Sequence, residues 1–171
     1  MACTAEWLPR FDVWATEPVP RVDQALVHKA RPENVLVARV EPVFEHHVAA
    51  QMVVPEEHPF FFEHPCDHVP GLALVEAGRQ VALVVAHTVY DVPIEGIAFL
   101  LQDLRIGFQR PAELDQPVFG RCELTDLEFR RGRLVGMTCA GHYLQSGEVV
   151  GSLSGRWSLL PEAVVQRMRR R

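Results

Sequence analysis

The feature that most constrains the fold is an apolar run from Pro70 to Ala86, which is long enough for a helix of several turns. Proline suits the first turn of a helix, because the N–H group that it lacks would find no partner there. A helix that is apolar almost all round must be enclosed on several sides to be stable in water. The run therefore predicts a central helix that is enclosed by a sheet.

One polar stripe interrupts this helix. Glu76, Arg79 and Gln80 stand at positions i, i+3 and i+4, so their side chains share one face. Burial on an apolar helix raises the pKa of a carboxyl group, whereas a neighbouring guanidinium lowers it. We interpret the stripe as the polar part of a site, with an ion pair at a seam between subunits as the alternative.

The sequence before the helix predicts two strands and a loop. The runs Asn34–Val40 and Phe44–Val54 are rich in β-branched and apolar residues, and they are separated near Pro42. The composition of Pro55–Asp67 is typical of a loop. Two strands and a loop therefore lead into the central helix.

After the central helix, apolar residues alternate with polar ones, as is typical of half-buried strands. This pattern predicts four strands. The first contains Leu104, Ile106 and Phe108, and the second contains Val118, Cys122 and Leu124. The third is the run Leu134–Leu144, and the fourth has Val149, Leu153, Trp157 and Leu159 on one face. The apolar phase slips to Leu127 and Phe129, which indicates a β-bulge. Gly132 and Ser146–Gly147 predict tight turns, and Glu162–Arg170 predicts a short terminal helix.

Together these elements specify an α+β fold of the hotdog type, in which an antiparallel sheet wraps around a long central helix. Residues 1–23 contain Pro9, Pro18 and Pro20 and no repeating apolar face, so they predict an N-terminal arm. Residues 24–171 predict a single hotdog domain, in keeping with a chain of 171 residues.

Composition narrows the class of protein. Hydrophobic residues make up 48% of the chain, charged residues 23%, and the formal net charge is −5. This balance is typical of a soluble globular protein and argues against a nucleic-acid partner. The most apolar segment, Val69–Val89, is interrupted by charged residues, which argues against a membrane partner. Cys3, Cys66, Cys122 and Cys139 show no CxxC spacing and fit reduced thiols, so we expect a cytoplasmic protein.

The loop before the central helix carries residues suited to chemistry. His64 and His68 precede the first turn, where the backbone N–H of Gly71 lacks a partner within the helix, and Glu76 follows shortly after. A histidine, free N–H groups and a carboxylate in this order can act on a thioester. Asp67 is expected to cap the helix or to hold a histidine.

The same loop offers a zinc alternative, because it contains several acceptable ligand types: His58, His64, Cys66, Asp67 and His68. Their spacing fits no established zinc pattern, and one loop rarely supplies a full set of ligands. We therefore predict no metal and no cofactor.

A longer motif runs from this loop into the helix. It reads His58-Pro-Phe-Phe…His64-Pro…Asp67-His68-Val-Pro-Gly71…Glu76-Ala-Gly-Arg79-Gln80, with Val27-His28-Lys29 upstream. In this order the residues resemble the A-factor biosynthesis hotdog family. More distantly, the positions from Pro59 to Gln80 are similar to the hotdog β-hydroxyacyl-carrier-protein dehydratases, with His64 on the catalytic histidine and Glu76 on the catalytic carboxylate. The loop from His64 to Pro70 is about two residues shorter than the dehydratase pattern, so His68 stays open as the alternative to His64.

The resemblance implies an activity. It implies transfer of a β-ketoacyl group from a thioester of acyl carrier protein or coenzyme A to the hydroxyl group of dihydroxyacetone phosphate or a similar small acceptor, on the way to γ-butyrolactone signals. In this reading Glu76 is the base, and the N–H of Gly71 holds the developing oxyanion. His64 or His68 orients the acyl group or protonates the leaving thiolate, and Asp67, Arg79 and Gln80 support them.

The resemblance also implies an assembly. Founding members of the family resemble two hotdog units in one chain, whereas this chain has the length of one. We therefore predict a homodimer, in which a histidine of one subunit faces the Glu76 carboxylate of the other. Two alternatives remain: a β-hydroxyacyl-thioester dehydratase or hydratase that uses the same residues, and a noncatalytic dimer that binds an acyl thioester.

Overall fold

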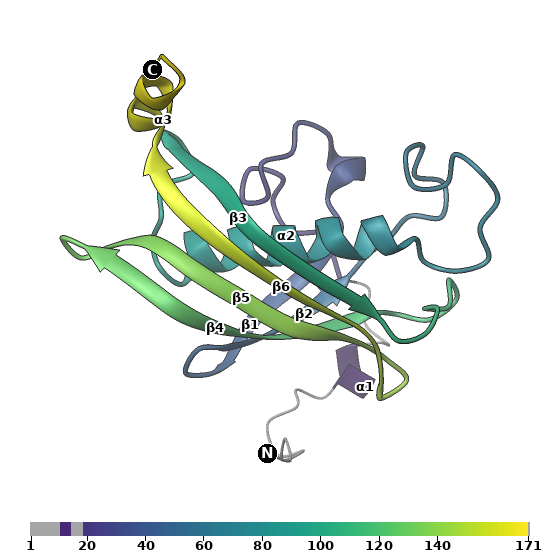
Figure 1. Cartoon of the computed structure of the whole chain (residues 1–171). Coiled ribbons are helices and arrows are strands. Elements are labelled where there is room, and N and C mark those ends of the chain that lie inside the picture. Colours follow the sequence, from purple (N-terminus) through teal and green to yellow (C-terminus); the bar gives the residue numbers. More distant parts are fainter. Residues whose placement is uncertain (1–10, 15–18, 171) are drawn as a thin grey trace.

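The fold is one antiparallel sheet that curves around a long helix (Figure 1). The computed structural model describes residues 11–14 and 19–170. Its elements are α1 (Phe11–Trp14), the 3-10 helix η2 (Pro32–Asn34), β1 (Val37–Phe44), β2 (His47–Met52), α2 (Gly71–Thr88), β3 (Ile97–Phe108), β4 (Phe119–Arg130), β5 (Arg133–Gln145), β6 (Glu148–Pro161) and α3 (Glu162–Arg169). The strands lie in the order β1-β2-β4-β5-β6-β3, with antiparallel pairing throughout. The predicted antiparallel sheet around a central helix is confirmed.

Helix α2 lies in the hollow of the sheet. Two polar side chains of the helix, Gln80 and His87, are buried as well, and Gln80 is fully buried. The helix predicted over Pro70–Ala86 is confirmed as Gly71–Thr88, with Pro70 at its N-cap. The side chains that α2 buries in the main core are small or branched and apolar: Ala73, Leu74, Ala77, Val81, Ala82, Val85 and Ala86.

Strand β5 reaches into the helix through one side chain. The Tyr143 hydroxyl donates a hydrogen bond of 2.6 Å to the carbonyl oxygen of Leu74. The ring can approach so closely because residue 78 of α2 is glycine, and a Cβ atom there would collide with the Tyr143 hydroxyl and with Leu153. This contact fixes the position of α2 over the middle of the sheet.

The break that the sequence predicts near Pro42 is wrong. Strand β1 runs through Pro42, and the chain turns at Glu45, whose φ is 41°. Proline is tolerated here because β1 lies at an edge of the sheet, where a missing N–H need not cost a ladder hydrogen bond. The start at Asn34 is also wrong, since this residue belongs to η2.

The four later strands are confirmed, with their turns and the bulge in β4. The register of β4 on β5 shifts between Thr125 and Glu128. The two tight turns, at Arg131–Gly132 and Ser146–Gly147, have positive φ at both central residues, as a type I′ hairpin turn requires. One expected inner residue is wrong: Val149 is 36% exposed and Val150 is buried instead, because the register of β5 on β6 shifts nearby.

The predicted N-terminal arm lies mostly outside the described residues. Within it, Phe11 stacks on Phe119 of β4 with a centroid distance of 4.6 Å, and Trp14 is buried beside them. The N–H of Val22 donates to the carbonyl oxygen of Val37 at 3.0 Å. The division between an arm and a hotdog domain at residue 24 stays a prediction.

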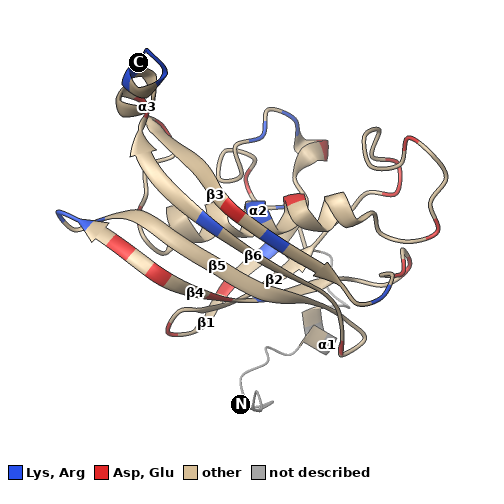
Figure 2. Ribbon diagram, viewed as in Figure 1, with Lys and Arg blue, Asp and Glu red and all other residues tan. Residues whose placement is uncertain are grey.

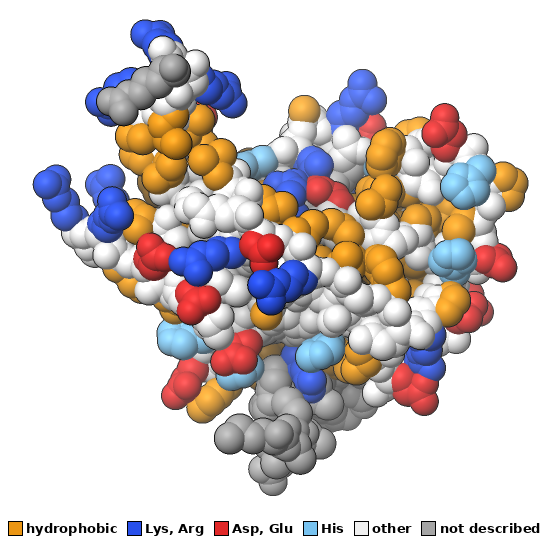
Figure 3. Space-filling view, in the orientation of Figure 1, with side chains coloured by type: hydrophobic (Ala, Val, Ile, Leu, Met, Phe, Trp, Pro, Cys, Tyr) orange, Lys and Arg blue, Asp and Glu red, His pale blue; other side chains and the backbone are white. Residues whose placement is uncertain are grey.

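The surface differs between the strands and the helix. Charged residues lie on the loops and along β3, β4 and β6, and few lie on α2 (Figure 2). Hydrophobic side chains surround the few charged groups beside α2 (Figure 3). No helix within residues 11–14 and 19–170 is long and apolar enough to cross a membrane. The edge strand β3 exposes four apolar side chains, Leu101, Leu104, Ile106 and Phe108.

Candidate functional site

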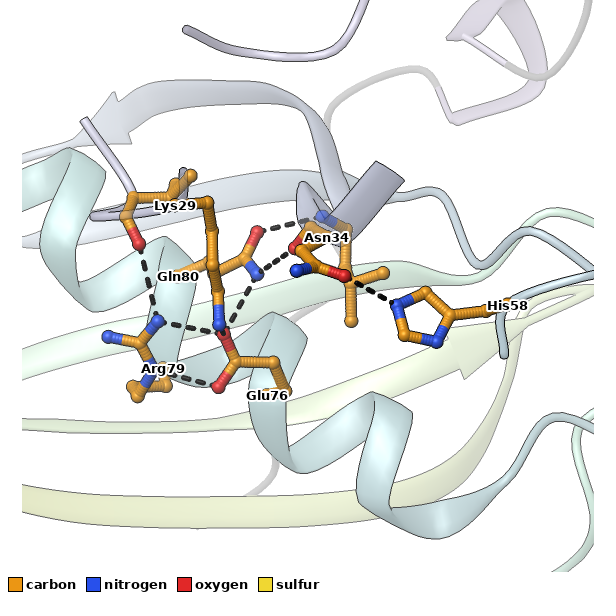
Figure 4. A network of polar contacts seen from close by, with 8 residues as sticks. Lys29, Asn34, His58, Glu76, Arg79 and Gln80 are labelled. Atoms are coloured by element: carbon orange, nitrogen blue, oxygen red, sulfur yellow. Dashed lines mark hydrogen bonds and ion pairs between the residues drawn. The ribbon is translucent and has the colours of Figure 1, made fainter. Parts of the chain in front are cut away.

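The Glu76 carboxylate is the centre of a polar network beside α2 (Figure 4). Arg79 holds it with two bonds, from Nε to Oε2 at 2.8 Å and from Nη2 to Oε1 at 2.7 Å. Gln80 donates to Oε1 at 2.9 Å, and the Lys29 ammonium lies 2.8 Å from the same oxygen. The three residues of the predicted polar stripe therefore do meet, and Lys29 joins them from a segment far away in the sequence.

The network sets the charge of Glu76. Burial favours the neutral carboxyl group, but the donors Arg79, Lys29 and Gln80 outweigh it and lower the pKa of Glu76 to about 2. The sequence leaves open whether burial or Arg79 prevails, and here the cation does. Glu76 is thus fully ionised near neutral pH and, while the network is intact, a weak base.

Gln80 ties the network to the segment that precedes β1. Its Oε1 accepts the backbone N–H of Leu36 at 2.8 Å, and its Nε2 donates to the carbonyl oxygen of Asn34 at 2.8 Å. Arg79 makes a similar link from Nη2 to the carbonyl oxygen of Val27 at 3.2 Å. The polar stripe of α2 therefore holds the chain between residues 27 and 36 in place.

A depression of about 440 Å³ opens above this network. Its polar lining consists of Lys29, Asn34, His58 and Glu76, and its apolar lining of Phe60, Phe61, Leu72 and Val75. Such a mixture of apolar walls and a few converging polar groups is typical of a small-molecule site.

His58 has a fixed role in the lining of the depression. Its Nε2 lies 3.0 Å from Asn34 Oδ1, and its Nδ1 accepts the backbone N–H groups of Phe60 and Phe61 at 3.3 and 3.4 Å. These bonds place the proton on Nε2, and burial lowers the pKa of the imidazole. His58 is therefore a neutral donor that orients Asn34.

His64 and His68, the two histidines expected to be catalytic, do not line this depression. His64 is exposed. His68 Nδ1 bonds Asp67 Oδ1 at 2.8 Å, which gives Asp67 the expected place beside a histidine and lowers the pKa of its carboxyl group. Within one chain the structure thus gathers His58, and not His64 or His68, with Glu76. A histidine from a second subunit remains a prediction.

Gly71 begins α2, and the N-cap residue, Pro70, makes no capping hydrogen bond through its side chain. The Phe108 ring of β3 lies directly over it, since a Cβ atom at residue 71 would stand 2.7 Å from Phe108 Cζ. A larger residue at position 71 would therefore have to displace this exposed ring. The role of its N–H as an oxyanion donor stays a prediction.

The five candidate zinc ligands do not gather into one group. His58 is bonded to Asn34, away from the rest. Among the residues that the structure describes, Cys66, Asp67 and His68 bring their ligating atoms within 4.8 Å of one another. Asp67 is 98% exposed, and three consecutive residues of a loop leave a tetrahedral site incomplete.

Sequence reasoning missed two members of the site. Lys29 had a signal, since Val27-His28-Lys29 is part of the recognised motif, but no role followed from it. Asn34 lay inside an expected strand and had no signal. Both reach the site because Arg79 and Gln80 hold their segment against α2.

Comparisons with known proteins identify the family and the fold. Residues 14–161 match the family described as the A-factor biosynthesis hotdog domain. A 2-oxo-3-(phosphooxy)propyl 3-oxoalkanoate synthase from Streptomyces griseus subsp. griseus is 32% identical over 133 residues, which are 73% of this chain and 40% of that protein. The synthase of the same name from Streptomyces coelicolor is 31% identical over 150 residues, or 86% of this chain and 41% of that protein. This chain spans less than half the length of these relatives.

Solved structures share the fold. A dehydratase heterocomplex, ApeI:P from Xenorhabdus doucetiae, superposes with a TM-score of 0.67 at 17% identity, over 90% of this chain and 100% of that chain. A mutant thioesterase from Pseudomonas aeruginosa gives a TM-score of 0.57 at 13% identity, over 85% and 97%. At these identities the likeness shows the hotdog fold alone.

Proposed function

Because this chain belongs to the A-factor biosynthesis hotdog family, we propose that it transfers a β-ketoacyl group from a thioester to the hydroxyl group of a phosphorylated three-carbon acceptor. The thioester is that of acyl carrier protein or coenzyme A, and the acceptor is dihydroxyacetone phosphate or a close relative. The names of the synthases support this reading, because a 2-oxo-3-(phosphooxy)propyl 3-oxoalkanoate is the ester that such a transfer forms.

One observation supports the proposal most: the polar network beside the depression combines two cations with a single carboxylate. Lys29 and Arg79 both bind Glu76, which leaves one positive charge in excess. An excess cation at a half-buried site suits the phosphate of the acceptor. We assign Lys29 to this phosphate, because it lines the depression whereas Arg79 is not part of that lining.

This assignment gives Glu76 a way to act as a base. While Lys29 holds it, its pKa of about 2 makes it too weak. A phosphate that draws Lys29 away removes one of the donors that lower the pKa, so the carboxylate becomes a stronger base only once the acceptor is bound. Glu76 then takes the hydroxyl proton as the oxygen attacks the thioester carbonyl.

The remaining steps fall to groups near the start of α2 and to a second subunit. The N–H of Gly71 holds the oxyanion, the C–S bond breaks, and His64 or His68 of the second subunit gives a proton to the leaving thiolate. The open edge of β3, with Leu101 45% and Phe108 53% exposed, is where we place that subunit. A second copy would supply the unit that the longer relatives have space to carry within one chain.

The test uses purified protein with a 3-oxoacyl carrier protein and dihydroxyacetone phosphate, and it follows the products by mass spectrometry. We expect the phosphorylated ester to form, and we expect K29M to raise the KM for the acceptor more than it lowers kcat. The control R169M removes an exposed cation from α3, and its kinetics should match the unchanged protein. Enoyl product from a β-hydroxyacyl substrate, without any ester, would assign the site to a dehydratase instead.

A further inference from the structure

Three consecutive residues, Val27, His28 and Lys29, are each attached to helix α2. Arg79 donates to the carbonyl oxygen of Val27 at 3.2 Å, and Lys29 Nζ lies 2.8 Å from Glu76 Oε1. Between them, His28 Nε2 lies 3.0 Å from Nε2 of His87, in the last turn of α2. The proposed reaction does not use His87.

His28 holds a backbone conformation that costs free energy. Its φ is 54°, in the left-handed region that favours glycine. The N–H of His28 donates to the carbonyl oxygen of Ala25 at 3.2 Å, and that of Lys29 donates to Gln24 at 2.9 Å. These are the two bonds of a Schellman turn, in which glycine is usual at the position that His28 occupies. A histidine at this position indicates that its side chain contributes something that offsets the strain.

The partner of His28 is itself held firmly. His87 is buried, and its Nδ1 lies 2.7 Å from the carbonyl oxygen of Val92. A carbonyl oxygen only accepts, so His87 Nδ1 carries a proton, and in a neutral ring its Nε2 is then an acceptor. His28 must therefore donate its Nε2 proton to His87. The Phe99 ring packs edge-on against both imidazoles, at 5.4 and 5.3 Å.

We propose that His28 and His87 are positioning residues of this site: their hydrogen bond fixes the turn at residue 28 and so aims the Lys29 ammonium at Glu76. The catalytic meaning of this inference rests on the proposed function, but the geometry that it describes does not. Neither histidine touches a reacting group. His87 acts through His28, and His28 acts through the backbone of Lys29.

The hydrogen bond between the two Nε2 atoms contains one proton, so it depends on the protonation state of each histidine. The charged and titratable groups that act on His28 are His87 and Arg79 of α2, and β3 packs the Phe99 ring against it. Burial, His87 and Arg79 all lower the pKa of His28. One added proton on His28 leaves the bond intact, whereas a proton on His87 Nε2 replaces the acceptor and breaks it.

The experiment measures the Lys29–Glu76 contact directly in the full chain. The pKa of Glu76 is followed by NMR with 13C-labelled glutamate carboxyl groups, assigned through E76Q, and the exposure of Lys29 by its rate of amine modification in mass spectrometry. H87N keeps a donor near Val92 but cannot reach His28. H87Q is the matched control, since it can reach His28 but gives up the Val92 bond. H28G removes the imidazole and relieves the strained turn.

We expect H87N and H28G to raise the pKa of Glu76 and to speed the modification of Lys29 about two- to fivefold, as suits release of a partly exposed ion pair. H87Q should stay close to the unchanged protein in both measurements. The inference is overturned if H28G leaves both readings unchanged, or if H87Q changes them as much as H87N does. Should H87N fail to fold, H28G decides alone, because its turn accepts glycine. A chain that shows these shifts but forms no ester would refute the proposed function and keep this inference.

Discussion

The side-chain oxygen of Gln80 accepts the backbone N–H of Leu36 at 2.8 Å, and both residues are fully buried. The same amide donates to Glu76 and to the carbonyl oxygen of Asn34. One side chain of the central helix thus satisfies a backbone donor, a backbone acceptor and the carboxylate of the site. The position of the segment that brings Lys29 depends on it.

This relationship makes Gln80 the polar residue of α2 that tolerates substitution least. We expect Q80L to lower the free energy of unfolding by about 2–4 kcal/mol, because the N–H of Leu36 and the oxygen of Asn34 lose their partners in the core. Urea denaturation measures the change. The control Q166L, on the exposed face of α3, should alter stability by less than about 0.5 kcal/mol. An equal loss in both variants would contradict the role given to Gln80.

Glu76 should make the protein sensitive to acid. Its pKa is about 2 in the folded chain and 4.5 when unperturbed, so its contribution to stability is complete above pH 4.5 and is lost as the pH falls toward 2. After allowing for its partial exposure, that contribution is about 1–2 kcal/mol. Other carboxyl groups titrate in the same range, so the measurement is the difference in unfolding free energy between the unchanged protein and E76Q. This difference should shrink between pH 5 and pH 2, and a constant difference would show that Lys29 and Arg79 do not hold the carboxylate.

The contact between Tyr143 and α2 predicts that residue 78 accepts no larger side chain. G78A places a methyl group against the Tyr143 hydroxyl and Leu153, and we expect it to lower the free energy of unfolding by about 2 kcal/mol or more. Y143F should cost about 1 kcal/mol through the lost bond to Leu74. Because the two changes share one contact, the double variant should be more stable than the sum of the single losses predicts. Strict additivity in thermal denaturation would argue against the contact.

The open edge of β3 should carry the subunit interface. We expect the unchanged protein to sediment as a dimer, and L104R to shift it toward the monomer, since Leu104 belongs to the exposed apolar row. E123R, on an exposed position of β4, is the control and should leave the mass unchanged. Dissociation by E123R but not by L104R would move the interface to the outer face of the sheet.

Much of the fold could be predicted because its signals are local. Three signals are of this kind: the apolar run of α2, the alternation in the later strands and the turns with positive φ. Each is formed by residues that are close to one another in the sequence. The prediction of a break near Pro42 is wrong because a strand can contain proline when it lies at an edge of the sheet, and the order of the strands is not a local property. Val149 was misread because the register shift beside it comes from the partner strand.

The residues of the site also differ in whether local sequence signals could predict them. Glu76, Arg79 and Gln80 could be predicted from their helical spacing. Lys29 could not be placed on Glu76, because the path of its segment is fixed by hydrogen bonds to α2 that no spacing reveals. The choice among the histidines depends on the course of the loop, which puts His58, and not the two residues closer to the helix, beside Asn34.

Pro42 has one more consequence. The sheet has two edge strands, β1 and β3, and proline removes a donor from the first of them. Further strands can therefore be added readily along one edge only. In the proposed dimer, two copies join through β3 and use up that edge in a single closed pair, so that only the edge with Pro42 stays open to fibre growth.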